Sequence, residues 1–205
     1  MAKKRKASDK RKTSETQIEL ALNLDSPDGT VINTGVGFFD HMLEALAKHS
    51  RFGLEVRAVG DLHIDQHHLV EDVGIVLGSV FRKALGEDLR IRRFSQAYAP
   101  LDEALARVVV DVSGRPYLHF DVDISSARVG EFDTDLVVEF YRAFVTNAGI
   151  CLHADLIRGS NAHHQIEALF KATALALRDA VAPDDGLKEV PSTKGTLSEK
   201  AARKS

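Results

Sequence analysis

The chain has 205 residues, 44% of them hydrophobic, and a formal net charge of −3 at pH 7. This length can bury the core of one domain or of two small ones, and the near-balanced charge excludes a broad basic surface for nucleic acid. No stretch approaches the 18 or so apolar residues of a membrane span, and no signal-peptide core follows the start. The single cysteine, Cys151, suits a reducing compartment. We therefore expect a cytoplasmic protein without membrane or nucleic-acid partners.

Residues 1–12 differ in composition from the rest of the chain. They contain seven Lys or Arg residues and no large apolar side chain beyond Met1. This composition predicts a disordered, solvated basic leader. A solubilising role is the default interpretation, and a tail for RNA or a membrane surface is the alternative.

The first half of the main domain, residues 13–90, predicts the order strand, strand, helix, strand, helix. Alternating apolar residues from Thr16 to Leu24 predict a half-buried strand. A turn at 26–29 leads into a short second strand at 30–33. The remaining elements are a helix at 38–49, a strand at 52–59 and a helix at 67–85, which Gly86 ends.

The second half, residues 91–190, repeats this order. Strands are predicted at 104–112, 116–123 and 150–157, and helices at 133–147 and from about 162 to 181, where Asn161 is the expected N-cap. The recurrence indicates an internal duplication. The predicted fold class is therefore α+β, with two ββαβα halves that each form a small sheet with helices packed on one face.

Each half carries the pattern His-His-x-x-Glu at the start of its last predicted helix. On a helix, residues i and i+4 share a face, whereas residue i+1 points about 100° away. The first His and the Glu can therefore hold one ion together, while the second His faces another. Solvated helix ends that happen to carry histidine are the alternative, which the recurrence disfavours. The two sets are His67, His68 and Glu71, and His163, His164 and Glu167.

Two such helices side by side predict two metal sites, each taking a His/Glu pair from one helix and a lone His from the other. His41 and Glu139 precede the two patterns at similar distances, and by pseudo-symmetry each joins the site opposite its own half's pair. Site one then contains His67, Glu71, Glu139 and His164, and site two contains His41, His68, His163 and Glu167. Nitrogen and oxygen ligands without sulfur favour Mn(II), two ions per active site. Because the ligands lie off the apolar stripes of their helices, we expect a second subunit to close each site.

Longer motifs extend this pattern over residues 13 to 197. They are FFDHM around His41, DxHHxxED at 65–72, PLDEAL at 100–105, DVSGRP at 111–116, GSNAHHQIEALFKA at 159–172 and PSTKG at 191–195. Together they closely resemble the imidazoleglycerol-phosphate dehydratase family of histidine biosynthesis. The resemblance implies a dimanganese hydro-lyase that converts imidazole glycerol phosphate to imidazole acetol phosphate. It also implies a 24-subunit particle with active sites between subunits, and its ligand pattern falls on the same two sets of four.

The resemblance assigns further residues. Glu15 matches the family's substrate-contacting Glu and is our first candidate for proton transfer, with His49 second. Without the family, Glu15 would be interpreted as an exposed carboxylate and His49 equally well as a helix C-cap. The implied phosphate contacts are Arg93, Arg115, Lys171, Ser192 and Lys194, the last two in a C-terminal substrate-contacting segment and tail at 191–205. The other implied substrate contacts are His41, His67, Glu71 and His163.

Two positions depart from the family pattern. Many members have His where this chain has Glu139, and many have Gln where it has Ala45. Two other functions use the same ligands: a dinuclear phosphoesterase that activates water, and a non-catalytic, metal-dependent assembly protein. Neither accounts for SGRP together with PSTKG.

Overall fold

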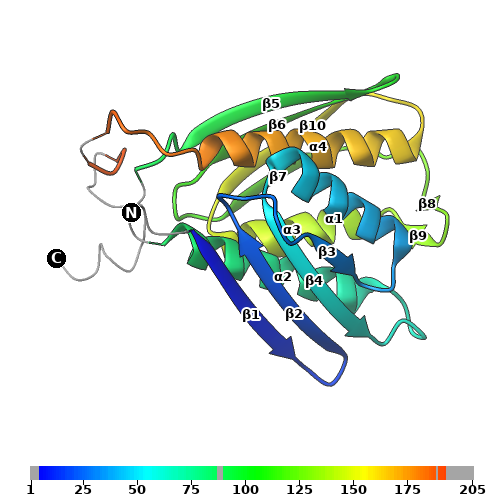
Figure 1. Ribbon diagram of the computed structural model, residues 1–205. Coiled ribbons are helices and arrows are strands. Elements are labelled where there is room, and N and C mark those ends of the chain that lie inside the picture. Colours follow the sequence, from blue (N-terminus) through cyan, green and yellow to red (C-terminus); the bar gives the residue numbers. More distant parts are fainter. Residues whose placement is uncertain (1–4, 87–89, 188, 193–205) are drawn as a thin grey trace.

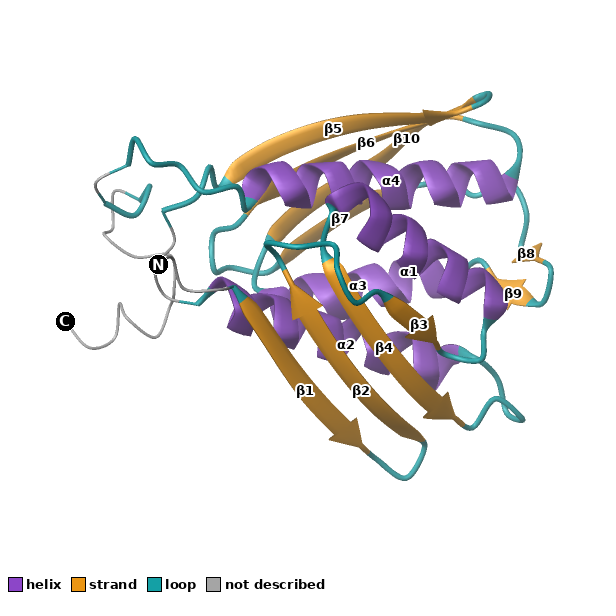
Figure 2. Cartoon of the chain, in the orientation of Figure 1, coloured by secondary structure: helices purple, strands orange, loops and turns teal. Residues whose placement is uncertain are grey.

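Four helices lie between two four-stranded sheets in a computed structural model that describes residues 5–86, 90–187 and 189–192 (Figures 1 and 2). The first sheet has the strand order β1-β2-β4-β3, and the second has the order β5-β6-β10-β7. The strands are β1 (Lys6–Lys12), β2 (Thr16–Asn23), β3 (Val31–Asn33), β4 (Gly53–Gly60), β5 (Phe94–Leu101), β6 (Ala104–Asp111), β7 (Tyr117–Asp121), β8 (Arg128–Val129), β9 (Phe132–Asp133) and β10 (Cys151–Arg158). The helices are α1 (Gly37–Ser50), α2 (His67–Leu85), α3 (Leu136–Ala148) and α4 (Ala162–Ala180).

The two sheets are built alike, which confirms the predicted fold class. In each sheet the first three strands of the order are antiparallel, and the outer strand β3 or β7 runs parallel to its neighbour. Each half has the order βββαβα, with a small β8–β9 hairpin added in the second. The predicted ββαβα unit was therefore one strand short, because it omitted the edge strands β1 and β5.

The prediction of a disordered leader at 1–12 is wrong for residues 6–12, which form strand β1. Residues 1–4 lie outside the described chain. The charged residues of β1 alternate between the two faces of the strand. The inward-facing Arg11 bonds to Asp72 of α2 at 2.9 Å, and Asp9 bonds to Lys83 of the same helix at 2.5 Å. Composition alone suggests a solvated tail, whereas these ion pairs and the ladder to β2 hold the segment as an edge strand.

Strand β5 was not predicted from the sequence, for a different reason. Its sequence contains Pro100 and no β-branched residue, so it lacks a strong strand signal. Proline is tolerated at the edge of a sheet because one side of an edge strand needs no ladder hydrogen bond. Antiparallel pairing with β6 over residues 94–101 supplies the order that local propensity does not.

Helices from opposite halves pair with each other: α1 packs on α4, and α2 packs on α3. Gly74 and Gly78 of α2 make the second contact close, because a Cβ there would lie 2.8 Å from the Phe140 carbonyl oxygen and 2.4 Å from that of Phe144. The inner faces of both sheets join the helices in one apolar core that includes Ile18. Within the described residues, no helix combines the length and apolarity needed to cross a membrane.

Candidate metal centre

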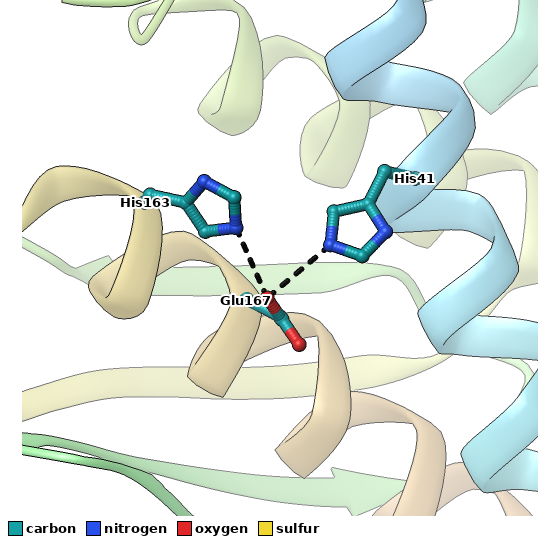
Figure 3. A group of neighbouring side chains, drawn as sticks. All are labelled: His41, His163 and Glu167. Atoms are coloured by element: carbon teal, nitrogen blue, oxygen red, sulfur yellow. Dashed lines mark hydrogen bonds and ion pairs between the residues drawn. The ribbon is translucent and has the colours of Figure 1, made fainter.

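Helices α1 and α4 bring His41, His163 and Glu167 to one point between them (Figure 3). Nε2 of His41 lies 3.3 Å from Oε2 of Glu167, and Nε2 of His163 lies 3.1 Å from the same oxygen. The three ligand-type atoms lie within 4.8 Å of one another, and both rings remain open to solvent. Two imidazole nitrogens and a carboxylate oxygen that converge in this way fit a divalent transition metal.

The start of α4 fixes two of these three side chains. As predicted, Asn161 is the N-cap, and its Oδ1 accepts the backbone N–H groups of His163 and His164 at 2.9 and 3.3 Å. The i,i+4 spacing then places His163 beside Glu167. His41 arrives from the other half of the chain through the α1–α4 contact, which is the opposite-half pairing expected from pseudo-symmetry. The ligand role of all three residues stays a prediction.

Lys171, one helical turn beyond Glu167, holds its other carboxylate oxygen at 2.7 Å. Burial raises the pKa of the Glu167 carboxyl, but the hydrogen bond and charge of Lys171, with the two histidines, lower that pKa to about 2. Glu167 is therefore ionised at neutral pH and ready to accept a cation.

The matching group of the first half is only partly assembled. His67 and Glu71 face each other on α2, with Nε2 and Oε2 3.9 Å apart. Glu139 instead bonds to Arg142 of its own helix, whose Nη1 lies 2.6 and 2.5 Å from the two carboxylate oxygens. The three side chains do not form a cluster of the kind that His41 completes in the second half.

The two remaining histidines lie outside the clustered group and are held at Nδ1. His68 Nδ1 lies 3.0 Å from Asp61, and His164 Nδ1 lies 2.8 Å from Glu103. These hydrogen bonds raise the pKa of each imidazole. Neither ring belongs to the His41 group, so a single chain does not bring the four predicted ligands of either site together.

Glu15 lies in the turn between β1 and β2, near His68. Its Oε2 is 4.0 Å from His68 Nδ1, and its side chain is half exposed. Thr13 shapes the turn, because its hydroxyl oxygen accepts the backbone N–H groups of Glu15 and Thr16. The structure thus places the first proton-transfer candidate beside a predicted ligand, with a carboxylate free to reach outward.

An open pocket of about 590 Å³ adjoins the His41 group and contains the second candidate, His49. Ala45, Lys48 and Lys171 also line it. Burial and the charge of Lys171 lower the pKa of His49, so its imidazole is neutral at pH 7. A neutral imidazole beside ammonium groups can accept a proton, and the ammonium groups suit an anionic substrate.

The predicted phosphate contacts do not gather in one chain. Arg93 lies at the far end of α4, where its backbone N–H donates to Ala180 and its guanidinium binds Asp111 at 2.7 Å and the Pro191 carbonyl at 2.6 Å. Arg115 is exposed in the turn after β6, and Lys171 lies midway along α4. Nine residues, about 14 Å of helix, separate Lys171 from Ala180, which Arg93 contacts. Ser192 is described at the end of the chain, and Lys194 lies outside the described residues.

Sequence reasoning missed three residues that contact the predicted ligands: Asp61, Glu103 and Arg142. Glu103 lies inside PLDEAL but 61 positions from the ring it holds, and Asp61 lies seven positions before His68. Arg142 follows Glu139 by one helical turn. Only that i,i+3 spacing was a usable signal in the sequence.

Comparisons with known proteins agree with the sequence resemblance. The sequence profile of the imidazoleglycerol-phosphate dehydratase (IGPD) family matches residues 34–177. The dehydratase of Methylobacillus flagellatus is 55% identical over 198 residues, which is 96% of this chain and all of that protein. The dehydratase of Azoarcus sp. is 56% identical over 188 residues, which is 91% of this chain and 96% of that protein.

Two solved structures share the fold. The dehydratase of Staphylococcus aureus superposes with a TM-score of 0.80 at 44% identity, covering 87% of this chain and 99% of that chain. The IGPD of Pyrococcus furiosus, crystallised in complex with (S)-C348, gives the same TM-score at 36% identity over 92% of this chain and 99% of that chain.

Proposed function

Because the chain belongs to the imidazoleglycerol-phosphate dehydratase family, we propose that it carries out that family's reaction with two Mn(II) ions held between subunits. The reaction itself follows from family membership: the chain is a hydro-lyase of histidine biosynthesis that removes water from imidazole glycerol phosphate to give imidazole acetol phosphate. The convergence of His41, His163 and Glu167 is the observation that carries the metal part of the proposal.

The second-half ion is held by His41, His163 and Glu167 of one subunit and by His68 of a second copy of the chain. The first-half ion is held by His67, Glu71 and Glu139 of that second copy and by His164 of the first. The ionised Glu167 and the solvent-facing rings support this assignment. The mixed nitrogen and oxygen donors favour Mn(II), which would supply Lewis acidity and fixed positive charge at the substrate's imidazole.

The acid–base and binding roles fall to groups around these ions. Glu15 moves the substrate proton, since its carboxylate is exposed beside His68, and the neutral His49 is the second candidate. Lys171 binds the substrate phosphate from the wall of the pocket. Arg93, Arg115, Ser192 and Lys194 complete the phosphate site from another subunit, because they belong to the opposite end of α4 or to the segment beyond it.

The separation of these groups in one chain supports an active site that is shared between subunits. In this proposal, the subunit number of 24 is the one that the family resemblance implies, and the cytoplasmic location is the one expected from the sequence. Each site then combines α1 and α4 of one subunit with α2 and α3 of its neighbour. A contact between two different surfaces of the same chain repeats around a closed particle. No single subunit is competent by itself in this arrangement.

Complementation between two inactive variants tests the shared site. His68→Ala and His164→Ala each remove a ligand, and each should lower product formation by more than about a hundredfold. Chelation should dissociate and inactivate the protein, and Mn(II) should restore both assembly and activity. When equal amounts of the two variants are mixed before Mn(II) is added, roughly a quarter of all sites in the reassembled particles combine two intact surfaces and recover activity.

His119→Ala is the control, because His119 is exposed on β7 and groups with Asp121 and Asp155, not with any of the predicted ligands. It should retain wild-type activity and leave the mixture unaffected. Failure of the mixed variants to recover would overturn the sharing of sites between subunits. Wild-type turnover by either single variant would overturn the ligand assignment itself.

A further inference from the structure

The turn before the second strand of each half carries a glutamate in the same position. Glu15 directly precedes β2, and Glu103 directly precedes β6. Both lie next to Nδ1 of the second histidine of their own half's His-His-x-x-Glu helix. The distances differ: Glu15 Oε2 is 4.0 Å from His68, whereas Glu103 Oε2 is 2.8 Å from His164. The two glutamates are therefore counterparts that make different contacts.

Both carboxylate oxygens of Glu103 accept hydrogen bonds. One carboxylate oxygen accepts the backbone N–H groups of Ser160 and Asn161 at 3.1 and 2.8 Å, and the other accepts Nδ1–H of His164. It therefore joins the β5–β6 turn to the first residues of α4. In the first half, Asp61 takes the place next to the ring, with both of its oxygens 3.0 to 3.3 Å from His68 Nδ1. That arrangement leaves the counterpart Glu15 outside hydrogen-bond distance.

A carboxylate can only accept, so in the neutral imidazole the Nδ1 atom beside it must carry the proton. The other nitrogen, Nε2, is then unprotonated and able to bind a metal. Carboxylates that hold histidine ligands in this way set both the tautomer and the direction of the ring. Here the same arrangement occurs twice, on the two histidines that lie outside the His41, His163 and Glu167 group.

We propose that Asp61 and Glu103 are positioning residues that hold His68 and His164 by Nδ1 and present Nε2 to a metal ion on a neighbouring subunit. This inference rests on the proposed function, in which these two histidines are ligands. It adds a division of roles between the halves: Asp61 orients His68, so the glutamate of the first half is free for the substrate, whereas Glu103 itself orients His164.

Mn(II) affinity of the metal-depleted protein, measured by competition with a fluorescent chelator, tests the role of Asp61 without reference to turnover. The measurements are made in a Glu15→Ala background, because Glu15 is near enough to replace a missing Asp61. In that background Asp61→Ala should weaken Mn(II) binding by about tenfold to a hundredfold. Asp61→Asn should stay within about threefold of its background, since its amide oxygen still accepts Nδ1–H.

Glu103 gives the opposite result with its amide variant. In Glu103→Gln the amide oxygen stays with the Ser160 and Asn161 N–H groups, so the amide NH₂ faces Nδ1 of His164. That contact favours the tautomer with the proton on Nε2, and Mn(II) binding should weaken by about tenfold or more. Because the backbone contacts are kept, a loss there reports on the ring and not on the fold of the turn.

Asp65→Ala is the matched control. It removes a neighbouring carboxylate that accepts the backbone N–H of His67 at 2.8 Å and has no hydrogen bond to an imidazole. Its Mn(II) affinity should stay within about threefold of wild type. Equal losses for Asp61→Asn and Asp61→Ala, or tight binding by Glu103→Gln, would overturn the positioning role. If His68→Ala and His164→Ala also bind Mn(II) normally, the ligand assignment fails as well; if those two lose it, only the positioning role is wrong.

Discussion

The two His-His-x-x-Glu helices have the same motif but different surroundings. On α4, Glu167 already contacts His41, His163 and Lys171. On α2, the ion pair of the equivalent Glu71 within the described part of the chain is a weaker contact with His67 at 3.9 Å, and the expected third member, Glu139, is bound by Arg142. The halves thus differ in how far the metal-binding groups are organised before any cation arrives.

The buried contacts between these two helices and their sheets show the reverse: here the first half has the stronger polar contacts. Asp72, next to Glu71, is buried and accepts from Arg11 of β1 and from the Thr16 hydroxyl of β2 at 2.5 Å. The corresponding residue of α4 is Ala168, and the residue that starts β6 is Ala104, both buried. At this position polar bonds connect α2 to its sheet, whereas buried alanines take the equivalent places on β6 and α4. The two halves therefore place their predicted metal ligands at equivalent positions but differ in the contacts beneath the helices that carry them.

The largest expected effect comes from breaking each cluster at its carboxylate. Glu71→Gln and Glu167→Gln should each lower product formation by more than about a hundredfold, because each removes an anionic ligand. In the metal-free protein at pH 7, however, Glu167→Gln should lower the melting temperature, because it removes the ion pair with Lys171. Glu71→Gln should leave the melting temperature unchanged. Assays with Mn(II) and melting curves without it separate the two effects. Equal melting shifts would mean that the second-half cluster is no better organised than the first.

Asp72 and Thr16 form a buried polar contact that has no counterpart in the second half. Asp72→Ala should lower the free energy of unfolding by about 2 kcal/mol, since it removes hydrogen bonds to a buried carboxylate. The double variant Asp72→Ala/Thr16→Ala copies the second half and should cost less than the sum of its two single changes. Urea unfolding of the metal-free variants measures this. Glu19→Ala, which breaks the exposed Lys10–Glu19 pair, is the control and should cost less than about 1 kcal/mol.

Acid should remove the stability that the ionised Glu167 contributes to the second-half group. Glu167 has a pKa of about 2 in the folded protein against an ordinary value of 4.5, so its ionised form stabilises the metal-free fold above pH 4.5. That stability, about 3 kcal/mol at most, is lost as the pH falls from 4.5 toward 2. Wild type should therefore lose more stability over this range than Glu167→Gln. If the stability of the two proteins falls equally between pH 4.5 and 2, Glu167 does not make this contribution.

The smallest effect should come from releasing Glu139. Arg142→Gln frees the carboxylate from an exposed pair, and such pairs contribute up to about 1 kcal/mol, so Mn(II) affinity of the first-half site should rise by no more than about fivefold. Glu139→His should also keep the site able to bind metal, with a neutral ligand in place of an anion. Mn(II) titration of both variants decides whether Arg142 restrains the site. A fall in affinity for Arg142→Gln would show that the arginine supports it instead.

Local spacing was enough to predict much of this protein. The helix at 67–85 begins and ends where the structure has α2, and Asn161 caps α4 as expected. These features depend on neighbours three or four residues apart, so their physics lies within the sequence segment itself. The pairing of His41 with the opposite half's motif followed from the repeat, because duplicated units fold alike.

Long-range contacts decided the rest. The edge strands β1 and β5 are ordered by ladders to β2 and β6 rather than by their own composition. Asp61 and Glu103 reach their histidines from segments that follow or join strands, so these contacts depend on how the sheets and helices pack. Residue spacing alone predicted which side chains could bind metal and which helix faces they occupy. The tertiary structure decided which of them meet, because a hydrogen bond between distant residues depends on how whole sheets and helices pack.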